Sequence, residues 1–417
     1  MSDEQVDKVS LTVFVKKEVN KVVYAEAGKD FVDALFSFLT FPLGTIARLV
    51  AEESNIEAAR FGSVSSLYQS VKDLDENYLF SHTSKEFLLK PSNSMSAYCQ
   101  KMKLNIDDTE LLQSYFVCED KTCKIENMSC VSTVKNEKCI CGKLLNRRIS
   151  QSLNKENGFV KEGLSFIVSD DLYVVPNEVE MSLRFLEHHG VVDLLKLSFL
   201  SKTALTDFLF NKEHFVGNLD PKNPIEFWIG EKEEELPEGF VVKVVRRKSN
   251  KQILFVEAKV GFVDFVFSFL TYPLGGLLSM IGGYSFISCI DNIYKSMTEL
   301  SPERFLRSQE LKDLLTSPRI SYKFVDPIPK SPISGAYTKD SSTFMVTNDL
   351  VVSPMSSINV ASYLKRMNVS PDDLDEGVLG INFEEGVSIL KASLTSTSAL
   401  TKGLKPQPLH NRTIFAP

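Results

Sequence analysis

The sequence repeats itself, and this repetition limits the possible folds more than any other feature. The segment LTVFVKKEVNKVVYAEAGKDFVDALFSFLTFPLG at 11–44 is echoed by VKVVRRKSNKQILFVEAKVGFVDFVFSFLTYPLG at 242–275, and both contain FVD-x-x-FSFLT-x-PLG. Three further pairs follow in the same order: 66–74 with 292–300, 166–176 with 344–354, and 194–206 with 389–401. Ordered matches of this kind indicate two copies of one module.

The first block of each copy predicts a β-hairpin followed by a helix. Two short runs rich in Val, Phe and Tyr flank Asn20 in copy 1 and Asn250 in copy 2. Asn tolerates the positive φ that a tight hairpin turn requires. Behind each hairpin, apolar residues recur at helical spacing, and Pro42 and Gly44 end this stretch in copy 1. We expect four phenylalanine side chains of these helices to be buried: Phe36, Phe38, Phe267 and Phe269.

The later blocks add a second hairpin to each copy. FIVS-DD-LYVV and FMVT-ND-LVVS carry Asp or Asn at the centre, where these residues favour a tight turn. Behind them, SLRFLEHHG at 182–190 and NVASYLKRMN at 359–368 are expected to be helical. Hairpins and helices that do not alternate as regular βαβ units predict an α+β fold. The expected architecture is two tandem copies of one hairpin-and-helix module.

Prolines and an acidic run separate the two copies, in the stretch EHFVGNLDPKNPIEFWIGEKEEELPEG. The interval between Leu74 and Phe166 is much longer than the one between Leu300 and Phe344, which indicates an insertion at about 85–160 of copy 1. We therefore expect four parts along the chain: a first copy at 9–212, a linker at 213–239, a second copy at 240–404 and a tail at 405–417.

Most of the cysteines lie in this insertion. Their order is Cys118-x4-Cys123-x6-Cys130-x8-Cys139-x-Cys141-Gly142. Thiolates bind Zn²⁺ tetrahedrally, and a turn that ends in Cys-x-Cys-Gly can supply two of the four ligands. Because the stretch has few large apolar residues, a metal would give it order. We predict a structural zinc site held by Cys118, Cys123, Cys139 and Cys141, with Cys130 in reserve; the alternative is a loop with ordinary thiols.

The blocks together resemble a known family. FVD-x-x-FSFLT-x-PLG, SDDLYVVP, CICGK and the ending LLKxSxxSxxALT are similar to the plant family catalogued as domain of unknown function 674 (DUF674), over nearly the whole chain. The resemblance implies a plant source and a tandem arrangement, and it implies no reaction or ligand. Copy 2 lacks the cysteine insertion, so any role of that insertion belongs to copy 1.

The net charge and the first ten residues argue against several classes of protein. A formal net charge of -7 and a pI near 5.5 argue against a general nucleic-acid binder, which needs a basic face. The opening MSDEQVDKVS has acidic residues and no apolar stretch, so we expect neither a secretory signal nor a transit peptide. The expected location is cytoplasmic or nuclear. Cysteines there should be thiols or metal ligands rather than disulfides.

An uncharged run, Phe265–Ile290, is long enough to span a bilayer. Pro273 and several glycines interrupt it, and the matching segment of copy 1 carries Arg48 and Glu52. Since two related copies should bury such a segment in the same way, we expect core helices rather than a membrane span. Peripheral membrane association stays as an alternative.

Two pairs of carboxylates occupy matching positions, Glu26 with Asp33 and Glu257 with Asp264. Paired carboxylates can perform acid–base chemistry, and these four are the candidates for a catalytic role. An Asp near a helix N-terminus and a Glu at the end of a solvated strand explain the pattern without catalysis. The chain contains no Walker phosphate loop, no G-x-G-x-x-G, no G-x-S-x-G and no H-E-x-x-H.

These observations favour a non-catalytic protein-binding or regulatory protein with a structural zinc loop. The partner would be another protein, whose identity the sequence does not reveal. The first alternative is an enzyme or small-ligand binder with a site between two lobes. The second is peripheral membrane association.

Overall fold

The computed structural model describes most of the chain. The linker predicted at 213–239 lies outside the described residues except for Gly239, and the tail at 405–417 lies outside them entirely. The described residues are 9–52, 62–79, 82–93, 95–100, 102–106, 115–120, 131–132, 137–139, 141–149, 158–177, 184–186, 188–210, 239–316, 337–339 and 342–404.

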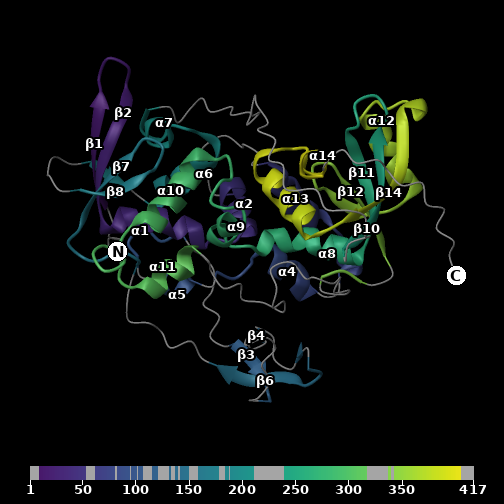
Figure 1. Ribbon diagram of the computed structural model, residues 1–417, viewed down its shortest axis with the longest axis horizontal. Coiled ribbons are helices and arrows are strands. Elements are labelled where there is room, and N and C mark those ends of the chain that lie inside the picture. The colour runs from purple at the N-terminus through teal and green to yellow at the C-terminus, as the bar shows by residue number, and fades with distance from the viewer. Residues whose placement is uncertain are drawn as a thin grey trace, which may run out of the picture. The chain divides into compact units, whose positions relative to one another are not determined.

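The protein combines helices with antiparallel sheets, which confirms the α+β prediction (Figure 1). It forms two compact units, each built from three segments of the chain. Unit 1 contains 1–59, 90–217 and 271–327, and unit 2 contains 60–89, 218–270 and 328–417. Each unit therefore includes residues from both sequence copies.

The sheet of unit 1 has the strand order β8-β7-β2-β1-β9, with all neighbours antiparallel. Alternate residues of β2, Ala25 and Ala27, are buried, and Glu26 between them points to the other face. The strands are β1 Val9–Lys16, β2 Lys21–Gly28, β7 Ser165–Ser169, β8 Val174–Pro176 and β9 Arg184–Leu186.

The sheet of unit 2 repeats this arrangement in the order β13-β12-β11-β10-β14. The first hairpin of each sheet has a register shift at the same place, between Phe14 and Val15 in unit 1 and between Val245 and Arg246 in unit 2. The strands are β10 Phe240–Arg247, β11 Ile253–Lys259, β12 Thr343–Thr347, β13 Val352–Pro354 and β14 Leu374–Ile381.

The turns of the first hairpins only partly follow the prediction. Asn20 has a φ of 46°, as expected for the turn of copy 1. In copy 2 the positive φ, 59°, belongs to Lys251 and not to Asn250. The side chain of Asn250 instead accepts a hydrogen bond from the backbone N–H of Gln252 at 3.0 Å, so it stabilises the turn from a neighbouring position.

The helices that follow the first hairpins also match. Copy 1 continues with α1 Lys29–Ser37, η1 Phe38–Thr40 and α2 Leu43–Glu52, and copy 2 with α8 Val260–Ser268, η3 Phe269–Thr271 and α9 Leu274–Met280. The predicted burial is confirmed, because Phe36, Phe38, Phe267 and Phe269 are all 0% exposed. None of the described helices is long and apolar enough to cross a membrane.

The next helices of the two copies exchange places. Helices α3 Gly62–Asp73, η2 Glu76–Tyr78 and α4 His82–Leu89 come from copy 1 and belong to unit 2. Helices α10 Ser288–Glu299 and α11 Gln309–Thr316 come from copy 2 and belong, with α9, to unit 1. Each unit thus contains the sheet of one copy and the exchanged helices of the other.

Matched hydrogen bonds hold the exchanged helices. In unit 2 the Ser63 hydroxyl of α3 donates to the backbone oxygen of Ser396 at 2.6 Å. At the equivalent place in unit 1 the Cys289 thiol of α10 donates to the backbone oxygen of Ser201 at 3.0 Å. Burial raises the pKa of Cys289 to about 12, so its thiol keeps the proton that this bond uses.

The last helices of each copy fix the start of the second strand. In copy 1 these are α6 His188–Leu200 and α7 Ala204–Phe210, and in copy 2 they are α13 Phe383–Thr395 and α14 Ala399–Gly403. The repeated Ala-Leu-Thr ending has a structural role. The Thr206 hydroxyl oxygen accepts the backbone N–H of Val22 at 2.9 Å, and Thr401 accepts that of Ile253 at 2.9 Å.

One pair of predicted helices is half wrong. The segment at 359–368 is helical, within α12 Ser357–Arg366, which is followed by η4 Pro371–Asp373. The corresponding segment of copy 1, at 182–190, contains strand β9 before α6 begins at His188. Pairing of Arg184–Leu186 with the edge strand β1 overrides the local periodicity.

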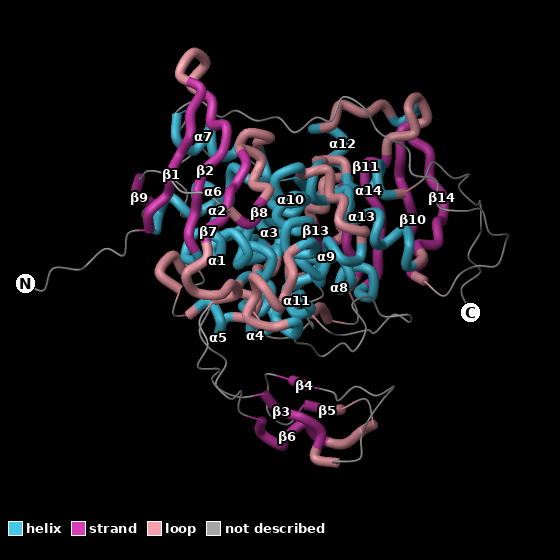
Figure 2. Tube along the Cα trace, turned by 60° about the vertical axis from the view of Figure 1, so that its left-hand side comes forward, coloured by secondary structure: helices cyan, strands magenta, loops and turns pink. Residues whose placement is uncertain are grey.

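The insertion of copy 1 forms the short helix α5 Ser96–Cys99 and a third sheet. That sheet has four strands in the order β4-β3-β6-β5, which pair only with one another in the described part of the chain (Figure 2). They are β3 Tyr115–Cys118, β4 Val131–Ser132, β5 Glu137–Lys138 and β6 Leu144–Ile149.

Candidate metal centre

The third sheet brings three of the predicted zinc ligands to one place. Cys118 ends β3, Cys139 directly follows β5, and Cys141 lies in the turn that leads into β6. Both strands pair with β6, where Cys118 and Glu137 are partners of Leu145 from opposite sides. The strand pairing therefore sets the distance between the two cysteine-bearing segments.

A tight turn presents Cys139 and Cys141 together. The backbone N–H of Gly142 donates to the Cys139 carbonyl at 2.8 Å, and the Cys139 N–H donates to the Lys143 carbonyl at 2.7 Å. Gly142 has a φ of 85°, which only glycine adopts without strain. This explains why glycine follows the second cysteine of the Cys-x-Cys pair.

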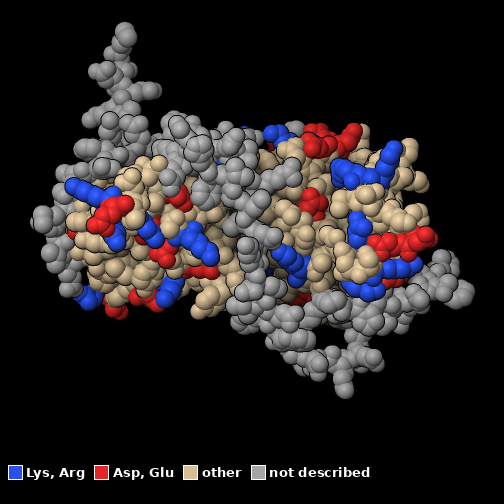
Figure 3. Space-filling view, turned by 90° about the horizontal axis from the view of Figure 1, so that it is seen from above, with Lys and Arg blue, Asp and Glu red and all other residues tan. Residues whose placement is uncertain are grey.

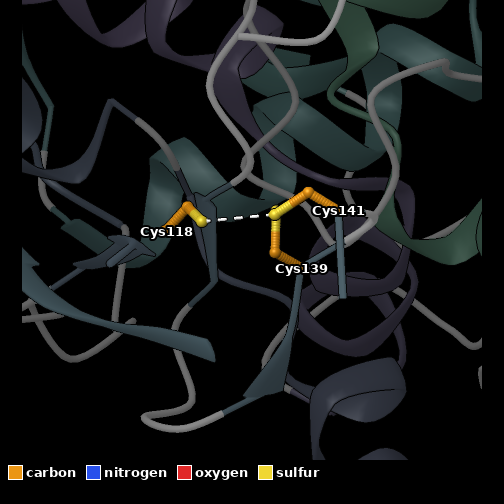
Figure 4. Close-up of side chains that lie close together, drawn as sticks. All are labelled: Cys118, Cys139 and Cys141. Atoms are coloured by element: carbon orange, nitrogen blue, oxygen red, sulfur yellow. Dashed lines mark hydrogen bonds between the residues drawn. The ribbon is translucent and has the colours of Figure 1, made fainter. Parts of the chain in front are cut away.

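The three thiols converge on a common point (Figure 4). Their sulfur atoms all lie within 4.8 Å of one another, and the Cys118 and Cys141 sulfurs are 3.5 Å apart. Bonds of about 2.3 Å in a tetrahedron place ligand sulfurs about 3.8 Å apart. The observed spacing therefore needs only small side-chain adjustments to hold a metal ion.

The cluster is also the core of its sheet. Cys118, Cys139 and Leu145 are 3%, 4% and 3% exposed, and Phe116 packs against them, whereas Cys141 is exposed. So few apolar side chains bury too little surface to hold a sheet together. A metal would supply the missing stabilisation.

A lysine lies next to the thiols. Lys143 forms an ion pair with Asp120 at 2.7 Å, and this hydrogen bond is the main cause that raises the pKa of Lys143. Electrostatic interaction with Cys141 and Cys118 raises it further. In turn, a nearby ammonium group favours the thiolate form, which is the form that binds metals.

The remaining predicted ligands, Cys123 and Cys130, lie outside the described residues. Within the described residues, Cys118, Cys139 and Cys141 are the group of metal-ligating side chains that comes together. The five described cysteines are free thiols, as expected: Cys99, Cys118, Cys139, Cys141 and Cys289.

The carboxylates of copy 1 occupy separate places. Asp33 is 0% exposed and accepts hydrogen bonds from the backbone N–H groups of Phe159 and Val160 at 2.7 and 2.9 Å, and from the Lys29 ammonium at 2.7 Å. Burial raises the pKa of Asp33, while these donors lower it. Glu26 is not among the hydrogen-bond partners of Asp33; it is half-buried in β2.

Copy 2 uses Asp264 in the same way. Its carboxylate, 5% exposed, accepts the backbone N–H of Thr338 at 2.9 Å and the Thr338 hydroxyl at 2.8 Å. Glu257 is half-buried in β11, opposite Lys243 of β10. In both copies the aspartate ties the first helix to the segment that precedes the second hairpin.

One cavity was not predicted from the sequence. It measures about 400 Å³ and is lined at the turn end of β1 and β2 by lysines and aspartates from three separate segments. No local motif connects these segments, so only the fold reveals them. The charged lining residues are Lys16, Lys21, Lys202, Asp170 and Asp171.

Charges of both signs are mixed on the described surface. In the face that Figure 3 shows, basic and acidic side chains of the described residues lie interspersed rather than in one large basic area. On this face, the described residues form no continuous basic stripe of the kind that binds nucleic-acid backbones.

A family model agrees with the resemblance noted in the sequence. The model, described as Protein of unknown function (DUF674), matches residues 5–325 and 310–382. The chain belongs to the DUF674 family. Both the FSFLT blocks and the cysteine-bearing sheet of this DUF674 member lie within the first match. No curated protein and no solved structure matches the chain.

Proposed function

We propose that this DUF674 protein is a non-catalytic protein-binding protein whose third sheet is ordered by a structural zinc ion. The observation that carries the proposal is the convergence of three thiols, from Cys118, Cys139 and Cys141, within 4.8 Å. Zn²⁺ prefers such sulfur ligands, and a fourth thiolate would close the tetrahedron. Cys123 is the proposed fourth ligand, with Cys130 as its replacement.

The proposed set of four thiolate ligands supports a structural rather than a catalytic metal. Four thiolates leave no open position for water or substrate, whereas catalytic zinc keeps one. Among the described residues of the sheet, the buried side chains are those of Val117, Cys118, Cys139 and Leu145. A metal at this position would act mainly on the fold of the insertion.

The environment of the two matching aspartates, Asp33 and Asp264, supports a non-catalytic role for both copies. Asp33 and Asp264 are buried. Their carboxylates accept hydrogen bonds from backbone N–H groups and, in copy 1, from Lys29. A general acid or base must instead reach a proton on a substrate. These two carboxylates therefore stabilise the fold.

Metal content tests the zinc part of the proposal. Protein purified without chelators should contain one zinc per chain by elemental analysis, and Cys139→Ser combined with Cys141→Ser should reduce this to background. Cys99→Ala is the control, because Cys99 is buried in α5 outside the third sheet. Separate Cys123→Ser and Cys130→Ser variants identify the fourth ligand. Zinc-free wild-type protein would refute the site.

Affinity capture followed by mass spectrometry tests the binding part. We expect a reproducible protein partner for the wild-type chain and for the Cys99→Ala control. If the partner is lost with the Cys139→Ser and Cys141→Ser changes, the third sheet contributes to recognition. The absence of any specific partner would contradict a protein-binding function.

A further inference from the structure

One face of the sheet in unit 2 is covered by a helix. Helix α12 packs on this face, where Tyr363 donates its hydroxyl proton to the Leu254 carbonyl at 3.0 Å. The neighbouring apolar residues of α12 and the following turn, Val360, Leu364 and Met367, pack there as well. The sheet residues that this helix buries are Val245, Leu254, Phe255 and Met345, all at most 5% exposed.

The equivalent face in unit 1 is open. The corresponding side chains are Phe14, Val23, Tyr24 and Ile167, and none of them is buried. The contrast is largest at the bulge, where Val23 is 56% exposed and its counterpart Leu254 is 1% exposed. The rings of Phe14 and Tyr24 stack on each other at 4.4 Å between centroids.

Chain length explains the difference. Residues 355–373 connect β13 to β14 and include α12, whereas only 177–183 connect β8 to β9. The shorter connection has too few residues for a helix of ten residues such as α12 with a turn on either side. Among the described residues, the face of unit 1 therefore has no covering helix of its own.

The strand edge beside this face differs in the same way. Strand β14 pairs with β10 along its whole length, from Phe240 to Arg247. Strand β9 pairs only with Val9–Leu11 of β1, so in the described part of the chain the outer edge of residues 12–16 has no strand beside it. The turn end of the β1–β2 hairpin extends beyond the neighbouring helices in both views (Figures 1 and 2).

The charges of the described residues beside the two faces are arranged differently. The segment after α12 carries acidic residues that meet the basic residues of β10: Asp373 lies 3.5 Å from Arg247, and Asp375 lies 2.9 Å from Arg246. In copy 1, Lys16 occupies the position of Arg247 and lines the 400 Å³ cavity with Lys21 and Lys202. Among the described residues, the exposed Glu18 lies within ion-pair distance of Lys16, at 3.6 Å.

We propose that the open face of β1 and β2 binds an amphipathic helix of a partner protein, followed by acidic residues. This inference rests on the proposed protein-binding function and names the surface and the chemistry of the partner. The helix lays apolar side chains spaced three and four residues apart against Phe14, Val23, Tyr24 and Ile167. The acidic residues that follow it meet Lys16, Lys21 and Lys202.

The two copies within one chain supply the argument for this occupant. The same strand pair, with the same bulge, already binds such a helix and such an acidic segment in unit 2. In unit 1, the exposed Val23, the half-buried Phe14, Tyr24 and Ile167, and the lysines of the cavity form the remaining half of that arrangement. Stacked aromatic side chains on an open sheet provide the large contact area typical of recognition surfaces.

A peptide with the sequence of residues 355–376, MSSINVASYLKRMNVSPDDLDE, is the probe. Labelled with a fluorophore, it should bind saturably to the full-length wild-type chain in an anisotropy titration. Val23→Asp should weaken binding at least about tenfold, because it places a charge in the apolar contact. Val241→Asp is the matched control, since Val241 is an equally exposed strand valine at 62%, and it should change binding less than about twofold.

Two further measurements locate the contact. The peptide should slow hydrogen exchange in residues 12–24, and Lys16→Glu should weaken binding about threefold at low salt and less at high salt. A peptide with Ala in place of Tyr363 and Leu364 should not bind. No saturable binding, or equal binding to the wild type and Val23→Asp, would overturn the inference.

Other outcomes separate this inference from the proposed function. If sedimentation shows a wild-type dimer that Val23→Asp dissociates, a second copy of the chain occupies the face and the partner helix is refuted. If Val23→Asp keeps its zinc and its captured partner, the proposed function stands but this face is not the binding site. If no partner is captured at all, the proposed function itself fails.

Discussion

The two sheets share strand order, register and bulge, yet they bury different surfaces. The bulge residue Leu254 lies beneath α12, while its counterpart Val23 is mostly exposed. The backbone of the first hairpin therefore does not decide whether this face is core or surface. Whether this face is buried depends on the length of a connection far away in the sequence, between the second hairpin and the last strand of each sheet.

The strongest test of equivalence between the copies is the buried aspartate. Asp33→Ala should lower the stability of unit 1 by about 3–5 kcal/mol, because it removes the buried acceptor of the Lys29 ammonium and of two backbone N–H groups. Asp264→Ala should cost about 1–3 kcal/mol, because it removes the acceptor of the backbone N–H and the hydroxyl of Thr338. Hydrogen exchange of the strand amides in each unit measures both values, and equal losses would contradict this account.

Truncation at the bulge compares the two faces directly. Leu254→Ala should destabilise unit 2 by about 2–4 kcal/mol, because it opens a cavity beneath α12. Val23→Ala should change the stability of unit 1 by less than about 0.5 kcal/mol, as expected for an exposed side chain. Urea unfolding followed by circular dichroism measures the pair. A large loss at Val23 would mean that the face is covered in solution.

Removing the metal should affect only the insertion that copy 2 lacks. With a strong chelator, we expect residues 115–149 to become sensitive to protease, because two of the four buried side chains among the described residues of the third sheet are proposed metal ligands. The thermal midpoint of the two units should shift by less than about 2 °C, since strands β3 to β6 pair only among themselves in the described residues. Collapse of both units on chelation would refute a local role.

Acid should act on the acidic segment that follows α12 in unit 2. The backbone N–H of Ser249 donates to Asp373 and, with the Arg247 charge, lowers the pKa of this carboxyl below its ordinary value of 3.8. Stability from a lowered pKa is present above that ordinary value and is lost as pH falls through the lower folded value. Asp373→Asn should therefore slightly reduce the stability near pH 6 and flatten its loss below pH 4. Identical acid profiles for the wild type and the variant would disprove this contribution.

Sequence patterns predicted the parts of the fold that local residues decide. The FSFLT phenylalanines and the paired hairpins follow from spacing, and Cys139-x-Cys141-Gly142 predicted its turn. The strand at Arg184–Leu186 escaped prediction because its partner β1 is far away in the chain. The location of Cys123 stays a prediction.

The helix exchange could not be read from the sequence for a related reason. Ser63 and Cys289 occupy equivalent positions and make equivalent hydrogen bonds, each in the unit that carries the sheet of the other copy. Because the two sites are so similar, the residues fit either arrangement. Only the tertiary structure distinguishes an exchanged helix from one that stays in its own copy.

The exchange also sets the order of events on the ribosome. Unit 1 includes residues 271–327, so its sheet and first helices leave the exit tunnel long before the helices that complete it. At about 5–20 residues per second, synthesis of the intervening residues 218–270 alone takes several seconds. During this time α9, α10 and α11, which complete unit 1, have not yet been synthesised. A chain that ended after copy 1 would therefore contain no complete unit.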